Sequence, residues 1–142
     1  MNRSKYENLL ERIEKLRALS VDVPIIVEGK KDESALRAIG VKGKIFRIST
    51  GVPLFKFCED ISDRYPEVII LTDLDKEGER LFKKLKNYLL HKGVKINETF
   101  RKDILSKLET YEVESLYTRL MKVNGQKDFN MGLNDIGVYS SD

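Results

Sequence analysis

Short apolar runs alternate along the chain with longer segments in which apolar residues recur every three or four positions. The runs occupy residues 24–27, 44–48, 67–71 and 94–96. The third run is unbroken from Val68 to Leu71, and unbroken apolar runs rich in β-branched residues are typical of strands buried on both faces of a parallel sheet. The segments between the runs are long enough for right-handed helical crossovers. The pattern therefore predicts an α/β fold, a three-layer α/β/α domain on a four-stranded parallel sheet.

The helical spacing of apolar residues predicts helices between and around these strands. They are expected at residues 5–19, 32–40, 53–65, 76–91, 100–108 and 113–121. In the helix after Asp75, the face expected to pack consists of Leu81, Leu85, Tyr88 and Leu89. Tyr111, between the last two predicted helices, and Tyr117, in the last one, are likewise interpreted as packing residues rather than as nucleophiles.

With 142 residues, the chain has the size of one domain. We expect residues 1–22 to form a helix packing on the core, residues 23–97 to form the core, and residues 98–122 to form a helical extension of it. Residues 123–142 are rich in glycine and asparagine but alternate at Phe129, Met131 and Leu133. This segment is interpreted either as an extended docking segment for a protein partner or as a loosely ordered tail.

Two acidic residues follow the third predicted strand directly, at Asp73 and Asp75. Residues two apart in an extended chain point to the same side, so both carboxylates leave the strand end together. A helix is expected from Lys76, and turns between strand and helix are where open α/β sheets bind ligands. The pair is therefore a candidate cation site. The structural alternative is that Asp75 only caps the helix and Asp73 is a solvated strand end.

The end of the first predicted strand has a similar design, with Glu28 followed by Gly29. If the first and third strands are neighbours, Glu28 and the two aspartates face one cleft and repel one another. The chemistry therefore favours the strand order 2-1-3-4. A divalent cation would relieve the repulsion, and oxygen ligands that leave room for water and phosphate suit Mg²⁺, with Mn²⁺ as the alternative, better than zinc.

Several residues near these strand ends are candidates for holding a phosphate or supporting the acids. Asp32 is interpreted as the N-cap of the second helix or as a supporting residue behind the acids. The cluster of Ser49, Thr50 and Gly51 is either a phosphate-binding loop or an ordinary turn. The helix after Asp75 carries basic residues along one side, either a solvated face or a surface for the nucleic-acid backbone. The candidate nucleic-acid or phosphate-binding residues are Gly29, Lys30, Thr50, Gly51, Lys76, Gly78 and Arg80.

The two acidic motifs together resemble a known family. The chain is similar to the Rossmann-like Toprim domain of bacterial-type primases, type IA topoisomerases and small maturation nucleases in Val27-Glu28-Gly29-x-x-Asp32 and Asp73-x-Asp75-x-x-Gly78. The resemblance covers about residues 23–97. It implies that Glu28 acts as general acid or base and that Asp73 and Asp75, together with Glu28, hold the metal.

The resemblance and the chain length narrow the expected function. The chain is too short for the nucleophile-bearing domain of a topoisomerase or the template-binding regions of a primase. The leading interpretation is Mg²⁺-dependent phosphodiester chemistry on RNA or DNA by a small Toprim nuclease, acting as a monomer or homodimer. The alternative is a non-catalytic Toprim protein that binds or scaffolds nucleic acid through the metal. A haloacid-dehalogenase-like phosphatase is disfavoured, because its Asp-x-Asp pair would lie near the first strand.

Composition adds a few limits to this interpretation. The chain has 26 basic and 23 acidic residues, and its net charge of +3 fits either nucleic-acid function. A single cysteine excludes an intramolecular disulfide and a cysteine-based metal cluster. Since neither a long apolar run nor a signal peptide is evident, a cytoplasmic protein without membrane contact is expected.

Overall fold

The computed structural model describes residues 1–125 of the chain. Its elements follow one another as α1 (Arg3–Leu19), β1 (Ile25–Val27), α2 (Lys30–Ala38), β2 (Ile45–Arg47), α3 (Leu54–Arg64), β3 (Glu67–Ile70), α4 (Lys76–His91), β4 (Lys95–Asn97), α5 (Thr99–Lys107), the 3₁₀ turn η1 (Val113–Ser115) and α6 (Leu116–Gly125). The described part of the chain contains no helix that is both long and apolar enough to cross a membrane.

The four strands form one parallel sheet in the order β2-β1-β3-β4, which confirms the predicted topology. In the sheet, Ile26 of β1 lies opposite Phe46 of β2 on one side and Ile70 of β3 on the other. Because all strands run the same way, their carboxyl ends meet at a single edge of the sheet. The residues that follow β1, β2 and β3 are therefore gathered at that edge.

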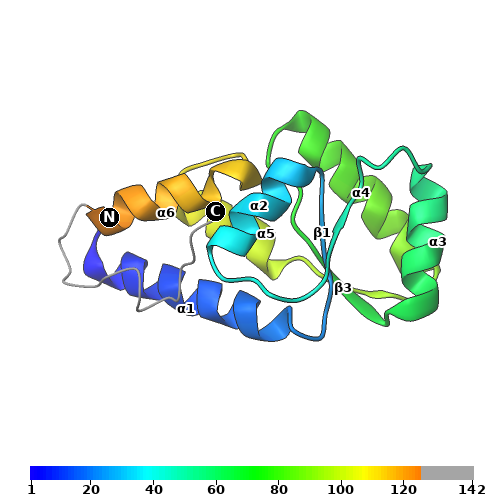
Figure 1. Ribbon diagram of the computed structural model, residues 1–142, viewed down its shortest axis with the longest axis horizontal. Coiled ribbons are helices and arrows are strands. Elements are labelled where there is room, and N and C mark those ends of the chain that lie inside the picture. Colours follow the sequence, from blue (N-terminus) through cyan, green and yellow to red (C-terminus); the bar gives the residue numbers. More distant parts are fainter. Residues whose placement is uncertain (126–142) are drawn as a thin grey trace.

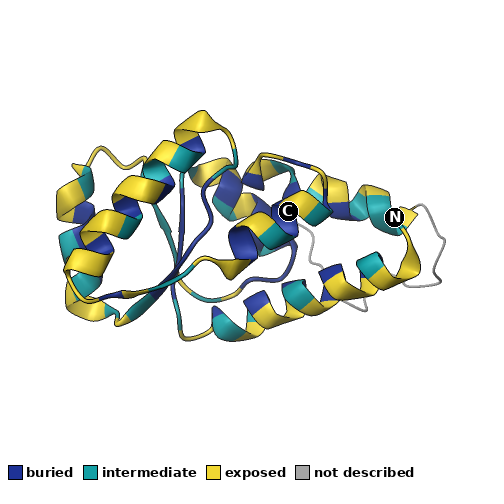
Figure 2. Ribbon diagram, turned by 180° about the vertical axis from the view of Figure 1, so that it is seen from behind, coloured by how far each residue is buried: buried dark blue, intermediate teal, exposed yellow. Residues whose placement is uncertain are grey.

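Helices cover both faces of the sheet (Figure 1). Alternate strand residues divide between two cores, since successive side chains point to opposite faces. Ile25 and Val27 join the core formed with α1, α2, α5 and α6, whereas Ile26 joins the core formed with α3 and α4. The central strand β1 is buried throughout and β3 is buried after Glu67, whereas β2 is half-buried and β4 begins at the exposed Lys95. The helices turn their exposed residues outward (Figure 2). The fold is thus the predicted three-layer α/β/α domain.

The buried face of α4 differs from the predicted one. Gly78, Phe82, Leu85 and Leu89 are its buried residues. Tyr88 is 44% exposed, so its predicted packing role is wrong. Tyr111 is 71% exposed, and the prediction that it packs is wrong as well. Tyr117 lies partly buried against the core formed with α1 and α2.

The C-terminal segments pack on the same face of the sheet as α1 and α2. The second predicted helix of the extension begins as η1 and continues as α6 to Gly125. The expected boundary at residue 122 therefore falls inside α6. The remainder of the expected tail, with its docking or loosely ordered segment, lies outside the described residues.

Candidate functional site

The carboxyl ends of β1 and β3 are joined by a direct contact between the two acidic motifs. The backbone N–H of Asp73 donates to Oε2 of Glu28 at 2.7 Å, across 45 residues of sequence. The tip of β2 is adjacent, because the N–H of Ser49 donates to the carbonyl oxygen of Glu28 at 3.0 Å. A Cβ on Gly29 would lie 3.4 Å from Oγ of Ser49. The predicted gathering of these residues at one sheet edge is therefore present.

Each of the three candidate acids accepts a hydrogen bond from a backbone amide. Besides the bond to Glu28, Oδ1 of Asp73 accepts from the N–H of Val113 at 2.8 Å. Oδ1 of Asp75 accepts from the N–H of Gly78 at 2.7 Å. Such bonds fix the orientation of a carboxylate. They also leave each acid at most one uncommitted oxygen with which to bind a ligand.

The site is electrostatically crowded. Burial is the main cause that raises the pKa of Asp73 to about 6, and the charges of Glu28 and Asp75 raise it further, against the lowering effect of the Val113 amide. Burial likewise raises the pKa of Glu28, with added contributions from the charges of Asp32 and Asp75. Nearby negative charge and burial both disfavour the ionised form. An added cation would favour it.

Asp32 does not cap α2 as predicted. The N-cap of α2 is Gly29, and Asp32 occupies the third helical position. From there its Oδ2 accepts a hydrogen bond from the N–H of Gly29 at 3.0 Å. The side chain at the third helical position thus bonds back to the backbone of the N-cap residue. Burial raises the pKa of Asp32 to about 6, and the charge of Asp73 adds to the increase. Asp32 therefore secures the residue that follows Glu28, and its supporting role stays a prediction.

Asp75 caps α4, as the structural alternative proposed, and is exposed. The turn that carries it is tightly closed. Oγ1 of Thr72 donates to the carbonyl oxygen of Gly78 at 2.8 Å. A Cβ on Gly78 would lie 2.0 Å from the carbonyl oxygen of Asp73, so no side chain fits there without moving the backbone. The cap uses Oδ1, which leaves Oδ2 of Asp75 for a second role.

The predicted phosphate-binding residues are only partly brought together. A hollow of about 490 Å³ beside Asp75 is lined by Leu74, Lys76, Glu79, Arg80 and Lys83. Arg80 forms an exposed ion pair with Glu77 on its own helix. Lys30 is exposed at the start of α2. Thr50 and Gly51 lie in the exposed loop after β2. There the N–H of Thr50 donates to the carbonyl oxygen of Ile48 at 2.8 Å.

Residues of the C-terminal extension also belong to this site, and the sequence analysis missed them. The N–H of Leu74 donates to the carbonyl oxygen of Tyr111 at 2.7 Å, next to the bond between Val113 and Asp73. The charge of Glu112 adds to the rise in the pKa of Asp73. Arg101 contacts the same turn from α5. No motif indicated these contacts, since each joins segments at least 28 residues apart.

The donor set fits a magnesium-type ion better than a closed metal site. Among the described residues, no three acidic, histidine or cysteine side chains already converge as a metal-binding group. Mg²⁺ usually binds through one or two carboxylates and keeps water or phosphate in its other positions. Asp73 and Asp75, each with one oxygen that accepts no backbone amide, could supply these one or two carboxylates. The raised pKa values of Glu28 and Asp73 indicate where a cation would be favourable.

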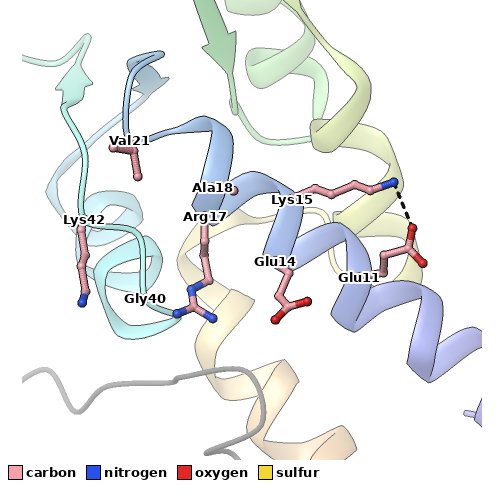
Figure 3. Close-up of a pocket in the computed structure, with 8 residues that line it drawn as sticks. All are labelled: Glu11, Glu14, Lys15, Arg17, Ala18, Val21, Gly40 and Lys42. Atoms are coloured by element: carbon pink, nitrogen blue, oxygen red, sulfur yellow. Dashed lines mark ion pairs between the residues drawn. The ribbon is translucent and has the colours of Figure 1, made fainter.

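A second hollow has a volume of about 580 Å³ (Figure 3). It is lined by residues of α1, including Glu11 and Lys15, which pair at 2.9 Å, and by Gly40 and Lys42, which precede β2. Residues that precede a strand lie at the amino edge of a parallel sheet. This hollow is therefore at the opposite end of the strands from the candidate site.

Comparisons with known proteins show the family of the chain. The Toprim domain family matches residues 23–104, a stretch that also includes Arg101. A UPF0292 protein of Thermococcus gammatolerans is 41% identical over 130 residues, which cover 90% of this chain and 95% of that protein. A UPF0292 protein of Methanocaldococcus jannaschii is 36% identical over 126 residues, with 86% and 98% covered.

A solved structure of a protein from Aquifex aeolicus is similar at a TM-score of 0.66 with 31% identity. The similarity covers 74% of this chain and 94% of that one. Toprim domains generally bind a divalent metal such as Mg²⁺ and are associated with nucleic acids. On the family match and these relatives, the chain belongs to the Toprim family and, within it, to the small UPF0292 proteins.

Proposed function

We propose that this protein cleaves phosphodiester bonds in nucleic acid in a Mg²⁺-dependent reaction, as a small Toprim nuclease, with Mn²⁺ able to replace Mg²⁺. The hydrogen bond from the Asp73 N–H to Oε2 of Glu28 is the observation that carries the proposal. It places a carboxyl group with a raised pKa directly beside the Asp-x-Asp motif. A proton-carrying group and two candidate metal ligands thus share one sheet edge.

The division of labour follows from the chemistry of each residue. Asp73 and Asp75 would hold the cation through the carboxylate oxygens that are not bonded to a backbone amide. The cation, when bound, would polarise the scissile phosphate and stabilise the leaving oxygen. The oxygen of a water molecule forms the new bond to phosphorus while the bond to the leaving oxygen breaks. Glu28 either accepts the proton of that water or delivers a proton to the leaving oxygen.

Substrate binding is assigned to the nucleic-acid backbone rather than to the bases. The hollow beside Asp75 is lined by Lys76 and Lys83, and it lies at the amino end of α4, where the helix dipole favours an anion. Lys30 lies exposed at the start of α2, after β1. Contacts of this kind position a phosphate without reading sequence.

The test uses end-labelled structured RNA, single-stranded DNA and duplex DNA, each with Mg²⁺, Mn²⁺ or chelator. We expect cleavage of at least one polymer with metal and none with chelator. Glu28→Gln and Asp73→Asn should each lower the rate at least about a hundredfold, the size expected when proton transfer or metal binding is lost. The matched control is Asp63→Asn, which removes the same charge from an exposed position on α3 and should cleave normally.

One observation supports the non-catalytic alternative. Asp75 caps α4 and all three acids accept backbone amides, so each also has a structural reason to be present. Binding that weakens with salt, without cleavage under any metal condition, would favour the alternative and contradict the nuclease. Cleavage that persists in both Glu28→Gln and Asp73→Asn would instead place the chemistry elsewhere.

A further inference from the structure

One buried arginine of α5 binds the turn that carries both aspartates. Arg101 is 6% exposed, and its guanidinium makes three hydrogen bonds. Nε donates to the carbonyl oxygen of Thr72 at 2.9 Å, and Nη2 donates to the carbonyl oxygen of Asp73 at 2.7 Å. Nη1 donates to Oε1 of Glu79 at 3.0 Å. A single side chain thus connects the end of β3 to the first turns of α4.

The surroundings of Arg101 hold the guanidinium in one orientation. Its Cζ lies 4.5 Å from the centroid of the Phe82 ring, so the ring of α4 supports the face of the cation. Burying a charge is costly unless the charge is paired and hydrogen bonded. Here the ion pair with Glu79 and the two carbonyl acceptors meet that condition. The buried guanidinium therefore holds the backbone after β3 in a fixed position, as a brace between that backbone and α4.

We propose that Arg101 is a positioning residue for the metal ligands, and this inference rests on the proposed function. It does not contact the cation. By bonding the carbonyl oxygens of Thr72 and Asp73, it sets the path of the backbone on which the Asp73 carboxylate is mounted. The contacts of Tyr111 and Val113 hold the same turn through Leu74 and Asp73. The C-terminal extension is then a working part of the site.

Lysine cannot replace arginine in this role. A guanidinium presents its N–H groups in a fixed planar fork, whereas an ammonium is a point charge on a flexible stem. Arg101→Lys keeps the charge but cannot reach the Thr72, Asp73 and Glu79 oxygens in the same geometry. Outer residues that orient metal ligands typically change metal affinity by about ten- to a hundredfold when they are replaced.

The experiment measures Mn²⁺ binding by electron paramagnetic resonance, without nucleic acid, on the wild-type protein and Arg101→Lys. The matched control is Arg12→Lys. Arg12 also stacks on an aromatic ring, with Cζ 4.7 Å from the Phe100 centroid, and pairs with Asp103 at 2.8 Å, but it joins α1 to α5 away from the acids. We expect Arg101→Lys to raise the Mn²⁺ Kd about tenfold and Arg12→Lys to leave it within about twofold.

A second variant, Glu79→Asp, tests the same contact in case Arg101→Lys does not fold. Glu79→Asp keeps the charge near the site but shortens the reach to Nη1, and Glu79 is partly exposed. We expect a smaller rise in the Mn²⁺ Kd, about two- to threefold. If Arg101→Lys and Arg12→Lys bind Mn²⁺ with the same affinity, or if Glu79→Asp has no effect, the positioning role is refuted. Mn²⁺ binding without cleavage by the wild-type protein would remove the nuclease proposal alone. Absence of Mn²⁺ binding would remove both.

Discussion

Three carboxyl groups at the carboxyl edge of the sheet have pKa values above their ordinary range. Burial is the leading cause for Glu28, Asp32 and Asp73, and their mutual charges add to it. For Asp32 and Asp73 the pKa rises from 3.8 to about 6. The folded protein therefore binds more protons than the unfolded chain between these values. These groups favour folding at acidic pH and reduce the free energy of unfolding as the pH rises toward 6.

Replacing Asp73 should therefore stabilise the metal-free protein at neutral pH. In Asp73→Asn, the amide oxygen can still accept the Val113 N–H, while the unfavourable charge is gone. After a discount for solvent screening, we expect a gain of about 1 kcal/mol at pH 7.5, or about 3 °C in Tm, that vanishes near pH 4. Thermal unfolding in chelator checks this, with Asp63→Asn as control. A lower Tm for Asp73→Asn at pH 7.5 would contradict the electrostatic account.

At this scale the sequence predicted which acids meet but not every local role. Glu28 and Asp73 were predicted to lie together because each follows a predicted strand, and a shared cation site requires those two strands to be adjacent. The error at Asp32 came from a three-residue ambiguity. An acid suits both the N-cap and the third position of a helix. The extended backbone of Gly29, with φ of −151°, decides in favour of Gly29 as the cap.

On the scale of the secondary-structure elements, α4 combines a structural cap with a candidate ligand at Asp75. The two roles can be separated by substitution, because asparagine caps helices as well as aspartate but carries no charge. We expect Asp75→Asn to keep the Tm within about 2 °C while weakening Mn²⁺ binding. Asp75→Ala should weaken binding and also lose about 1 kcal/mol of stability. Paired thermal unfolding and Mn²⁺ titrations test this. Equal Mn²⁺ affinity in the wild-type protein and Asp75→Asn would show that Asp75 caps the helix but does not bind the metal.

The rotation of α4 explains why its buried face was mispredicted. Gly78 must face the end of β3, since its backbone lies against Asp73. Residues 82, 85 and 89 then fall on the same side of the helix, at the spacing of one face. Tyr88 is turned toward solvent as a result. Apolar spacing alone allowed either face, and only the close approach at Gly78 chose between them.

The contribution of the C-terminal elements could not be predicted from local patterns. Arg101 and Val113 reach the β3–α4 turn through contacts across 28 to 40 residues, and both lie in helical segments whose periodicity predicted only packing. Val113 acts through its backbone amide, which no side-chain pattern can reveal. The strand order, by contrast, could be predicted from the sequence, because the side-chain chemistry of Glu28 and Asp73 required their strands to be adjacent.

For the whole molecule, the expected interaction with nucleic acid depends on where the charge lies more than on the net charge of +3. Lys83 lines the hollow beside Asp75, whereas Lys44 precedes β2 at the opposite edge of the sheet. The logarithm of the binding constant for a nucleic acid should fall linearly with the logarithm of the salt concentration. Lys83→Gln should reduce the salt slope by about 1, and Lys44→Gln should leave it unchanged. Fluorescence anisotropy at several salt concentrations measures both, and equal slopes would place the binding surface elsewhere.

The position of Arg101 and Val113 late in the chain has a consequence for protein synthesis. The ribosome makes the chain from its N-terminus, so all four strands and both acidic motifs are synthesised before α5 and η1. Until those last segments dock, the Asp73 carboxylate lacks the Val113 amide and its turn lacks the Arg101 brace. A nascent chain would thus carry the acids without the geometry that orients them. Docking of α5 and η1 is therefore the step that completes the candidate site during synthesis.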